Sequence, residues 1–385
     1  MTKPRLLYAV THPATAKHLL RGQLAFMQKN GFDVVVLSSP GPELELVRER
    51  EGVSTVAVTM SRALHLREGP RAMTKMLAAV RAARPDVINA STPKAGLLGM
   101  LAARALKVRA RVYLLRGLRL EGESGAFRSA LGIPERVASA CAHRVVCVSQ
   151  SLRRVYVDGG YAPELKTTVI PSNGIDLSRF PPHAESRVAA ARIRAELGIS
   201  DGDIVAGFVG RLVADKGVAD LIEGIERATL RVPQLKMLIV GGDLAGDALP
   251  KTLANALRAD ARFVFAGKVE DPAPYYAAMD LLVFPSYREG LPNVPLEAAA
   301  CELPTVGYRS TGMMDAISHG VTGELVRRGD AGALGDALVR YASSPQLRRI
   351  HGAAARVRVR DQFTNERTWT AWLRLYEELL AAHKR

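Results

Sequence analysis

The chain has 385 residues, enough for two α/β domains with substantial cores, and its 48% apolar and 24% charged residues are typical of a soluble globular protein. No stretch reaches the roughly 18 uninterrupted apolar residues of a membrane span, and the apolar run near the N-terminus is too short for a signal peptide. Three scattered cysteines exclude a disulfide framework and a cysteine-based zinc site, and they favour a reducing cytoplasm.

The net charge of +15 is concentrated in the first half of the chain. Residues 1–180 hold 27 Lys and Arg against 13 Asp and Glu, whereas residues 181–385 hold 26 against 25. A nucleic-acid surface, an anionic membrane surface and the arginine bias of a GC-rich genome compete as explanations. A genomic bias should enrich both halves equally, and the sequence carries no zinc finger or RNA-binding signature. We therefore expect an anionic membrane partner, with about 1 kcal/mol gained per basic residue near the leaflet, and no nucleic acid.

Short apolar runs alternate with helical patterns through the first half, the order that builds a parallel sheet. Strands are predicted over 5–10, 33–37, 53–58, 86–89, 111–115 and 144–148. A helix is predicted over His18–Asn30 and closed by Gly31, and a second, amphipathic helix over Met73–Arg84 is expected to pack on the sheet. The segment Ser61–Arg67 mixes apolar with basic residues and is instead expected at the membrane interface.

Polar residues that follow these strands are candidates for binding an anionic acceptor. Thr92-Pro93 predicts a helix start with Lys94 in its first turn, where a cation opposes the helix dipole, so a bound anion explains Lys94 better than stability does. Arg116 and Arg119 follow another strand and could bind a phosphate. His12 and Lys17 lie near the first helix start, where an ordinary polar loop is the alternative.

The second half repeats the alternation. Strands are predicted over 204–210, 236–240, 263–266, 281–284 and 305–308. We expect a first domain over 1–180, a linker over 181–203, a second domain over 204–361, and a C-terminal helix over 362–385 that returns to the first domain.

Two carboxylates follow the buried run Leu281–Phe284. Glu289 lies in the turn after the strand, and Glu297 lies near the start of an Ala-rich helix for which Asn293 is the expected N-cap. The free N–H groups of a helix start attract anionic ligands such as phosphate. A carboxylate at the same place must therefore have another task, and accepting hydrogen bonds from sugar hydroxyls is the one we expect. Complementing the helix dipole is the simpler alternative, and it suffices for Glu297 alone.

Two cations follow the first strand of the second half, in the sequence R-L-V-A-D-K-G. Arg211 and Lys216 stand between that strand and the helix expected at Gly217. A fixed pair of cations stabilises the charge that develops on a departing diphosphate. Two solvated surface cations are the alternative.

These motifs resemble those of the retaining family 4 glycosyltransferases, and the resemblance covers nearly the whole chain. E-G-L-P-N-V-P-L-E-A has the E-x7-E spacing of the donor-sugar motif, Arg211 and Lys216 match the paired cations, and T-P-K-A-G-L-L-G is similar to a segment of bacterial enzymes that extend lipid-linked oligosaccharides. The resemblance implies an α/β fold of two Rossmann-like domains that face each other across a cleft, the GT-B architecture.

The resemblance also assigns roles to residues. The expected catalytic residues are Glu289, Arg211 and Lys216. The expected donor-binding residues are Gly290, Leu291, Pro292, Asn293, Glu297, Gly210 and Lys268. The expected acceptor-binding residues are His12, Lys17, Lys94, Arg116 and Arg119. No cofactor and no metal are implied.

This chain departs from the family pattern mainly in the first domain. Arg116 stands where most relatives have His, Asn89-Ala90-Ser91 replaces His-x-His, and no Gly-Gly turn follows the first strand. In the second domain Glu302 replaces an expected Gly. The position of Arg116 therefore carries over, but the chemistry of an imidazole does not.

The expected reaction is transfer of a sugar from a nucleotide-diphosphate sugar, with UDP or GDP as the nucleotide, to an undecaprenyl-diphosphate-linked saccharide with retention at the anomeric carbon. The expected location is cytoplasmic, at the inner face of the cell membrane. A sugar-nucleotide sensor without turnover and a basic nucleic-acid-binding protein are the alternatives. A nicotinamide dehydrogenase is disfavoured because no G-x-G-x-x-G follows the first strand.

Overall fold

The structure is a computed structural model that describes residues 3–60, 69–122, 125–171, 174–242, 255 and 257–383. The chain forms two compact units, one of residues 1–174 with 365–385 and one of residues 175–364. The segment Ser61–Arg67, expected at a membrane interface, lies outside the described residues.

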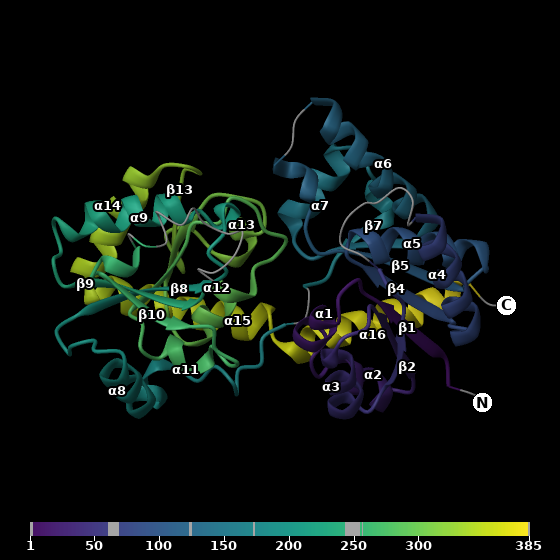
Figure 1. The fold of residues 1–385 in the computed structure, drawn as a ribbon, viewed down its shortest axis with the longest axis horizontal. Coiled ribbons are helices and arrows are strands. Elements are labelled where there is room, and N and C mark those ends of the chain that lie inside the picture. Colours follow the sequence, from purple (N-terminus) through teal and green to yellow (C-terminus); the bar gives the residue numbers. More distant parts are fainter. Residues whose placement is uncertain are drawn as a thin grey trace. The chain divides into compact units, whose positions relative to one another are not determined.

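Unit 1 (residues 1–174 and 365–385) is built on a seven-stranded parallel sheet with the strand order β3-β2-β1-β4-β5-β6-β7 (Figure 1). The strands are β1 (Arg5–Ala9), β2 (Asp33–Ser38), β3 (Ser54–Ala57), β4 (Val87–Ser91), β5 (Ala110–Leu115), β6 (Arg144–Cys147) and β7 (Thr167–Val169). Leu6, Leu7 and Ala9 of the central strand β1 are fully buried. The order reverses between β1 and β4, which makes the carboxyl ends of these two strands the place where such sheets bind ligands.

The helices of unit 1 cover the sheet. They are α1 (Pro13–Leu19), α2 (Gln23–Lys29), α3 (Pro42–Glu51), α4 (Gly69–Ala83), α5 (Pro93–Ala105), α6 (Gly125–Cys141), α7 (Gln150–Asp158) and α16 (Asn365–Ala382), with the short helices η1 (Arg119–Gly122) and η2 (Glu164–Lys166). α4 buries Ala72, Met76 and Val80, as its amphipathic pattern predicts. α16 belongs to unit 1 and buries Trp372 and Tyr376 completely.

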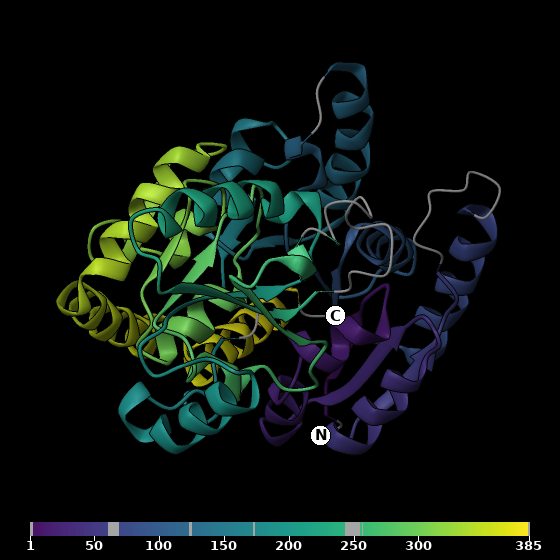
Figure 2. The ribbon, with the colours of Figure 1, turned by 60° about the vertical axis from the view of Figure 1, so that its left-hand side comes forward.

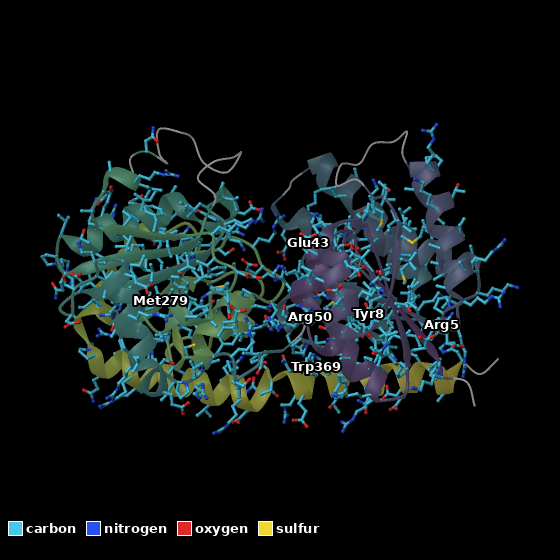
Figure 3. The ribbon with its side chains drawn as sticks, turned by 60° about the horizontal axis from the view of Figure 1, so that its bottom comes forward. Arg5, Tyr8, Glu43, Arg50, Met279 and Trp369 are labelled. Carbon is cyan, nitrogen blue, oxygen red and sulfur yellow. The ribbon has the colours of Figure 1, made fainter. Side chains whose placement is uncertain are left out.

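The single helix predicted over His18–Asn30 is wrong, because the structure has two helices there. α1 ends at Leu19 and α2 begins at Gln23, with Gly22 between them at φ 75°. A side chain at Gly22 would collide with Trp369 of α16, whose ring atom Cη2 lies 2.6 Å from the place of its Cβ. Trp369 is labelled in Figure 3. The tertiary contact with α16 therefore breaks a pattern that reads as continuous in the sequence.

Unit 2 (residues 175–364) has a six-stranded parallel sheet with the order β10-β9-β8-β11-β12-β13. The strands are β8 (Ile204–Gly210), β9 (Leu235–Gly241), β10 (Phe263–Gly267), β11 (Leu281–Phe284), β12 (Thr305–Tyr308) and β13 (Gly323–Val326). The order reverses between β8 and β11, so this pair forms the equivalent switch point. Every predicted strand of both halves coincides with a strand of the structure to within two residues.

Helices flank the sheet of unit 2 on both faces, with α9 and α14 on one and α12 and α15 on the other (Figure 1 and Figure 2). The helical segments are η3 (His183–Ser186), α8 (Arg187–Glu196), η4 (Ala214–Lys216), α9 (Val218–Thr229), α11 (Ala273–Tyr276), α12 (Asn293–Ala300), α13 (Met313–Ala316), α14 (Ala331–Ser343) and α15 (Pro345–Gln362). Segment 181–203, expected as a linker, contains η3 and α8 and belongs to unit 2.

The chain passes between the units at two places that lie side by side. Ile175 donates its backbone N–H to the carbonyl of Phe363 at 2.7 Å and pairs with Thr364 in an isolated bridge. The two connections between the units, one after Gly174 and one before Asn365, therefore leave unit 2 from paired segments of backbone.

Candidate active site

The carboxyl ends of β8 and β11 carry the two loops that hold the candidate catalytic residues of unit 2. The loop after β8 runs over residues 211–217 and includes η4, and the loop after β11 runs over residues 285–292. β8 and β11 are adjacent in the sheet, and their chains continue into α9 and α12 on opposite faces. A parallel sheet leaves a crevice at such a point, and this is where the E-x7-E segment and the loop that carries Arg211 and Lys216 lie.

Lys216 and Glu289 form an ion pair between the two loops. The ammonium group of Lys216 bonds Oε1 of Glu289, and the two side chains are only 19% and 15% exposed. The same ammonium lies 5.1 Å from the ring centroid of Phe284, at the end of β11. The structure therefore brings together two residues that are 73 positions apart in the sequence, at the edge where a ligand is expected.

Ser286 fixes the orientation of the Glu289 carboxylate. Its hydroxyl donates a hydrogen bond to Oε1 of Glu289 at 2.7 Å, and the Ser286 side chain is completely buried. Ser310, after β12, donates its own hydroxyl to the backbone carbonyl of Ser286 at 2.8 Å. Both Lys216 and Ser286 bond Oε1 of Glu289, so among the described residues Oε2 is left to accept from a ligand.

Backbone contacts hold the loops at fixed separation. Tyr287 donates its N–H to the carbonyl of Asp215 at 2.9 Å, and Arg288 bonds the Asp215 carboxylate at 2.8 Å. Gly217, at φ 68°, packs so closely that a Cβ there would lie 2.1 Å from the carbonyl oxygen of Pro285. The position of Lys216 is therefore set by the backbone as well as by its own ion pair.

Two further cations expected at this site, Arg211 and Lys268, follow strands of the same sheet. Arg211 directly follows β8 and is exposed, and Lys268 directly follows β10 and is exposed; neither side chain has a hydrogen bond or ion pair within the described part of the chain. Gly210 ends β8 with φ 145°. The structure thus joins Lys216 to Glu289 but leaves Arg211 and Lys268 apart from them.

The helix after this loop begins one residue earlier than predicted. α12 starts at Asn293, and Pro292 is its N-cap residue, in an extended conformation with no side-chain capping bond. The expected capping role of Asn293 is therefore wrong, because Pro292 already has the extended conformation that an N-cap needs. Leu291 and Pro292 are buried, and Gly290 lies against the loop of Gly312.

Glu297 of α12 is held by a tyrosine that the sequence analysis did not single out. Tyr276, fully buried at the end of α11, donates its hydroxyl to Oε2 of Glu297 at 2.7 Å. Burial raises the pKa of Glu297 above its ordinary value, although the bond from Tyr276 and the charge of Arg179 both lower it. Burying the charged form of Glu297 costs free energy, so its place in the fold indicates a role in binding rather than in stability.

In unit 1 the switch point is tied together by two threonines. Thr11, after β1, and Thr92, after β4, share a hydrogen bond of 2.7 Å between their hydroxyls, and the Thr11 hydroxyl accepts from the N–H of Ala95 at 3.2 Å. Thr92 has φ 71° and ψ 149°, a region that is unusual for a residue with a side chain. α5 begins at Pro93 and carries Lys94 in its first turn, as predicted.

Of three further predicted acceptor residues, only His12 has a local task for its side chain in the described part of the structure. His12 is the N-cap of α1, and its Nδ1 accepts from the N–H of Ala14 at 3.2 Å. Lys17 lies in the last turn of α1, where its carbonyl accepts from Arg50 at 2.9 Å. The backbone of Arg119 belongs to η1, and its side chain lies outside the described residues.

Arg116 lies above a buried polar network beneath the same edge. Its Nε approaches the Ser91 hydroxyl at 3.4 Å, and burial lowers the pKa of its guanidinium to about 10. Below it, Asn89 donates to the Tyr376 hydroxyl at 2.6 Å, and Tyr376 donates to Tyr8 at 3.3 Å. Figure 3 labels Tyr8 within this unit. α16 thus contributes Tyr376 to the core next to Arg116, a contact that the sequence pattern could not reveal.

Comparison with known proteins decides the family. The capsular polysaccharide biosynthesis glycosyltransferase CapM of Staphylococcus aureus is 30% identical over 365 residues, which cover 94% of this chain and 94% of that protein.

The chain belongs to glycosyltransferase family 4.

Two family descriptions match this family 4 chain separately: "Glycosyltransferase Family 4" over residues 20–179 and "Glycosyl transferases group 1" over residues 203–344. The UDP-Gal:alpha-D-GlcNAc-diphosphoundecaprenol alpha-1,3-galactosyltransferase of Escherichia coli is 26% identical and is covered over 74% of its length by 75% of this chain. The crystal structure of Anabaena Alr3699/HepE in complex with UDP-glucose superposes with a TM-score of 0.79 at 22% identity, over 98% of this chain and 99% of that one. The chain is therefore an α/β glycosyltransferase of two Rossmann-like domains.

Within the described residues of this family 4 chain, no helix is both long and apolar enough to cross a membrane. The same residues hold no group of three or more His, Cys, Asp and Glu side chains placed to bind a metal ion.

Sequence reasoning missed Ser286 and Tyr276, the partners of the two motif carboxylates. Only Ser286 gave a signal, because a polar residue follows the apolar run of β11 almost directly.

The raised pKa of Glu297 predicts a pH dependence of stability. A carboxyl with a higher pKa in the folded state contributes stability at low pH, and this contribution is lost as the pH rises from about 4.5 through the folded pKa. The free energy of unfolding should therefore fall less between pH 4.5 and pH 8 in Glu297→Gln, which keeps an acceptor for Tyr276, than in the wild type. Urea unfolding at both pH values measures this. Glu270→Gln, at an exposed carboxyl of the same unit, is the control, and parallel pH curves for Glu297→Gln and the wild type would contradict the prediction.

Proposed function

We propose that this glycosyltransferase transfers a sugar from a UDP-sugar to an undecaprenyl-diphosphate-linked saccharide, with retention at the anomeric carbon and without a metal ion. Two relatives support the substrates. The name of the Escherichia coli relative contains both a UDP-sugar and a diphosphoundecaprenol acceptor, and HepE was crystallised with UDP-glucose. The relative from Staphylococcus aureus serves capsular polysaccharide biosynthesis. A polysaccharide assembled on a lipid carrier is the product that this combination favours.

The Lys216–Glu289 pair is the observation that carries the proposal. In the free protein each group neutralises the other at the switch point of unit 2. When a donor binds, Lys216 turns its ammonium donors to the diphosphate, and Glu289 accepts from sugar hydroxyls through Oε2. As the bond from the anomeric carbon to the diphosphate breaks, charge builds on the leaving oxygens, and Lys216 stabilises it without reorganisation because its loop is already fixed.

The remaining donor residues complete the site by their places in unit 2. Arg211, exposed next to β8, is free to swing to the diphosphate as the second cation. The backbone N–H groups of Gly290, Leu291 and Asn293 lie at the start of α12, and Glu297 binds the ribose, with Tyr276 holding its other oxygen. Gly210 ends β8 and Lys268 follows β10, with β9 between these two strands, at the sheet edge where the base is expected.

The acceptor is assigned to unit 1. Lys94, in the first turn of α5, and Arg116, at the end of β5, lie at its switch point and offer cations to a lipid-linked diphosphate. His12 and Lys17 flank the neighbouring helix α1. Arg116 replaces the imidazole of relatives with a permanent cation, so its task is to bind phosphate rather than to exchange a proton.

Turnover with defined substrates tests the proposal. The full chain is incubated with radiolabelled UDP-sugars and GDP-sugars and with an undecaprenyl-diphosphate-linked saccharide, and the product linkage is read by NMR. We expect transfer from a UDP-sugar with the donor's anomeric configuration. Donor binding without turnover on any acceptor would instead indicate a sensor, and inversion would contradict the retaining assignment.

The basic character of residues 1–180 supports a peripheral position at the inner face of the membrane. We expect the full chain to co-sediment with phosphatidylglycerol vesicles and not with phosphatidylcholine vesicles, because about 1 kcal/mol is gained per basic residue near an anionic leaflet. Binding should weaken as salt rises from 0.05 to about 0.5 M, since the Debye length shortens severalfold. Equal binding to both lipids would count against this location.

A further inference from the structure

A basic cavity lies at the edge of the unit 1 sheet opposite to Thr92 and Arg116. Its volume is about 860 Å³, within the range of small-molecule sites. It is lined by residues that precede β4, β5 and β6, among them Asp86 and His143, and by the C-terminal ends of α4 and α5. Arg5, labelled in Figure 3, begins β1 at this same edge. The cavity is therefore separate from the candidate acceptor residues at the carboxyl ends of the strands.

Positive charge dominates the lining. The six cations are Arg81, Arg84, Arg104, Lys107, Arg109 and Arg111. The single carboxylate of the lining is Asp86, whose Oδ2 already accepts from the backbone N–H of Arg5 at 2.9 Å.

The negative C-terminal ends of helices compensate part of the positive charge of the lining, but not all of it. α4, α5, α6 and α16 all end at this edge, and each C-terminus carries about half a negative charge. Together with Asp86 they supply about three negative charges against six cations. Arg109 bonds the carbonyls of Leu380 and His383 at 2.6 Å each, and Arg111 bonds that of Cys141 at 2.7 Å. These two arginines therefore act as helix caps.

The other four cations have no such task. Arg81, Arg84, Arg104 and Lys107 are exposed, and their side chains make no hydrogen bond or ion pair with the described residues. Arg84 and Lys107 have φ 45° and 53° just after the ends of α4 and α5, where glycine is the residue that fits without strain. Stability alone favours glycine there, so both positions keep a cation at a conformational cost.

Neighbouring titratable groups report the same positive field. His143 stacks on His383 with ring centroids 4.0 Å apart, and burial followed by the charge of Arg111 lowers the pKa of His143 to about 4. Burial and the charge of Arg104 lower the pKa of Arg111. An anion in the cavity would relieve this repulsion among like charges.

We propose that this cavity binds a diphosphate group, with Arg84, Arg104 and Lys107 as its main donors. Diphosphate oxygens accept several charge-assisted hydrogen bonds at once, which matches several cations around one concave site. The proposal does not rest on the proposed function, because no residue of the donor or acceptor site takes part. The diphosphate can belong to a free metabolite or to a lipid headgroup, and the test separates these sources.

Radiolabelled pyrophosphate in equilibrium dialysis with the full chain, at constant ionic strength, tests the site. The triple variant Arg84→Gln/Arg104→Gln/Lys107→Gln is compared with Arg21→Gln/Lys29→Gln/Arg154→Gln, which removes the same charge from exposed positions of the same unit. We expect the cavity variant to lose at least about tenfold in affinity and the control to stay within about twofold of the wild type. Equal losses in both variants, or none in either, would overturn the proposal.

A site-specific readout keeps binding at Lys216 from being mistaken for this site. Pyrophosphate should protect Lys107 of the wild-type chain from an amine-reactive label, as read by mass spectrometry, and should leave Lys29 unprotected. Competition by phosphatidylcholine vesicles that carry a polyprenyl diphosphate, and not by phosphatidylcholine vesicles alone, would identify a lipid headgroup as the source, and its absence a free diphosphate. Vesicle binding without protection of Lys107 by pyrophosphate would contradict the cavity site and indicate a membrane-facing surface instead.

Discussion

Replacing Lys216 by alanine is expected to lower kcat for sugar transfer by about 10²–10³-fold while the fold is retained, as is usual when one preorganised donor to a developing anion is removed. Lys216 is the cation that the structure fixes at the switch point of unit 2, through Glu289 and through the loop of Gly217. In the proposed mechanism, its loss leaves only Arg211 to stabilise the departing diphosphate. Initial rates at saturating donor and acceptor, with circular dichroism of the same samples, measure the effect.

Arg231→Ala is the matched control for this prediction. Arg231 also forms an ion pair in unit 2, with Asp336, but both partners are more than 60% exposed; Arg231 follows the end of α9 and Asp336 lies on α14. Exposed pairs contribute little, so its kcat should stay near that of the wild type. If Lys216→Ala turned over as fast as Arg231→Ala, the charge of Lys216 would have no part in the reaction.

Glu289→Gln should lower transfer by a similar factor, and the two effects should not add. Lys216 and Glu289 share one bond, and residues in direct contact usually couple in a double-mutant cycle. The double variant should therefore lose less activity than the product of the two single losses. Strictly additive losses would mean that the two residues act on the donor independently.

Gly217→Ala is expected to have the second large effect, on stability and activity together. A left-handed φ costs a residue with a side chain about 1–2 kcal/mol, and a Cβ 2.1 Å from the Pro285 carbonyl forces the two loops apart at a further cost of about 1–3 kcal/mol. The free energy of unfolding should fall by about 2–5 kcal/mol, and transfer should fall because Lys216 moves with its neighbour. Urea unfolding and initial rates give the two quantities.

Gly198→Ala separates the cost of the backbone conformation from the cost of the steric clash. Gly198 also has φ 68° in unit 2, but a Cβ there would meet nothing within 4 Å. This variant should lose only the conformational cost of about 1–2 kcal/mol and keep its activity. Equal destabilisation of the two variants would show that the close approach to Pro285 does not constrain the loops.

The sheets could be predicted from the sequence because each strand is a short apolar run between turn residues, and this pattern is local. β11, with the sequence LLVF, is one example, and its predicted bounds are those of the structure. β7 and β13 were not assigned, since a run of three residues and one with Gly and Glu are too short and too polar for the pattern. The break between α1 and α2 was missed because its cause, Trp369, is far away in the sequence.

The candidate site could be predicted in its residue types and only partly in its contacts. The order of strands places the ends of β8 and β11 side by side, so the meeting of Lys216 with Glu289 follows from the topology. The partners of the carboxylates do not follow, because hydroxyl groups of serine and tyrosine leave no periodic signal. Tyr376 beneath Arg116 comes from α16, and no local pattern reports that contact.

The most direct test of the account is a structure of the chain with a bound UDP-sugar. The account predicts that Lys216 leaves its bond with Glu289 to donate to the diphosphate, while Glu289 accepts from the hydroxyls of the sugar. A donor seated elsewhere, with Lys216 and Glu289 still paired as in the free protein, would contradict it.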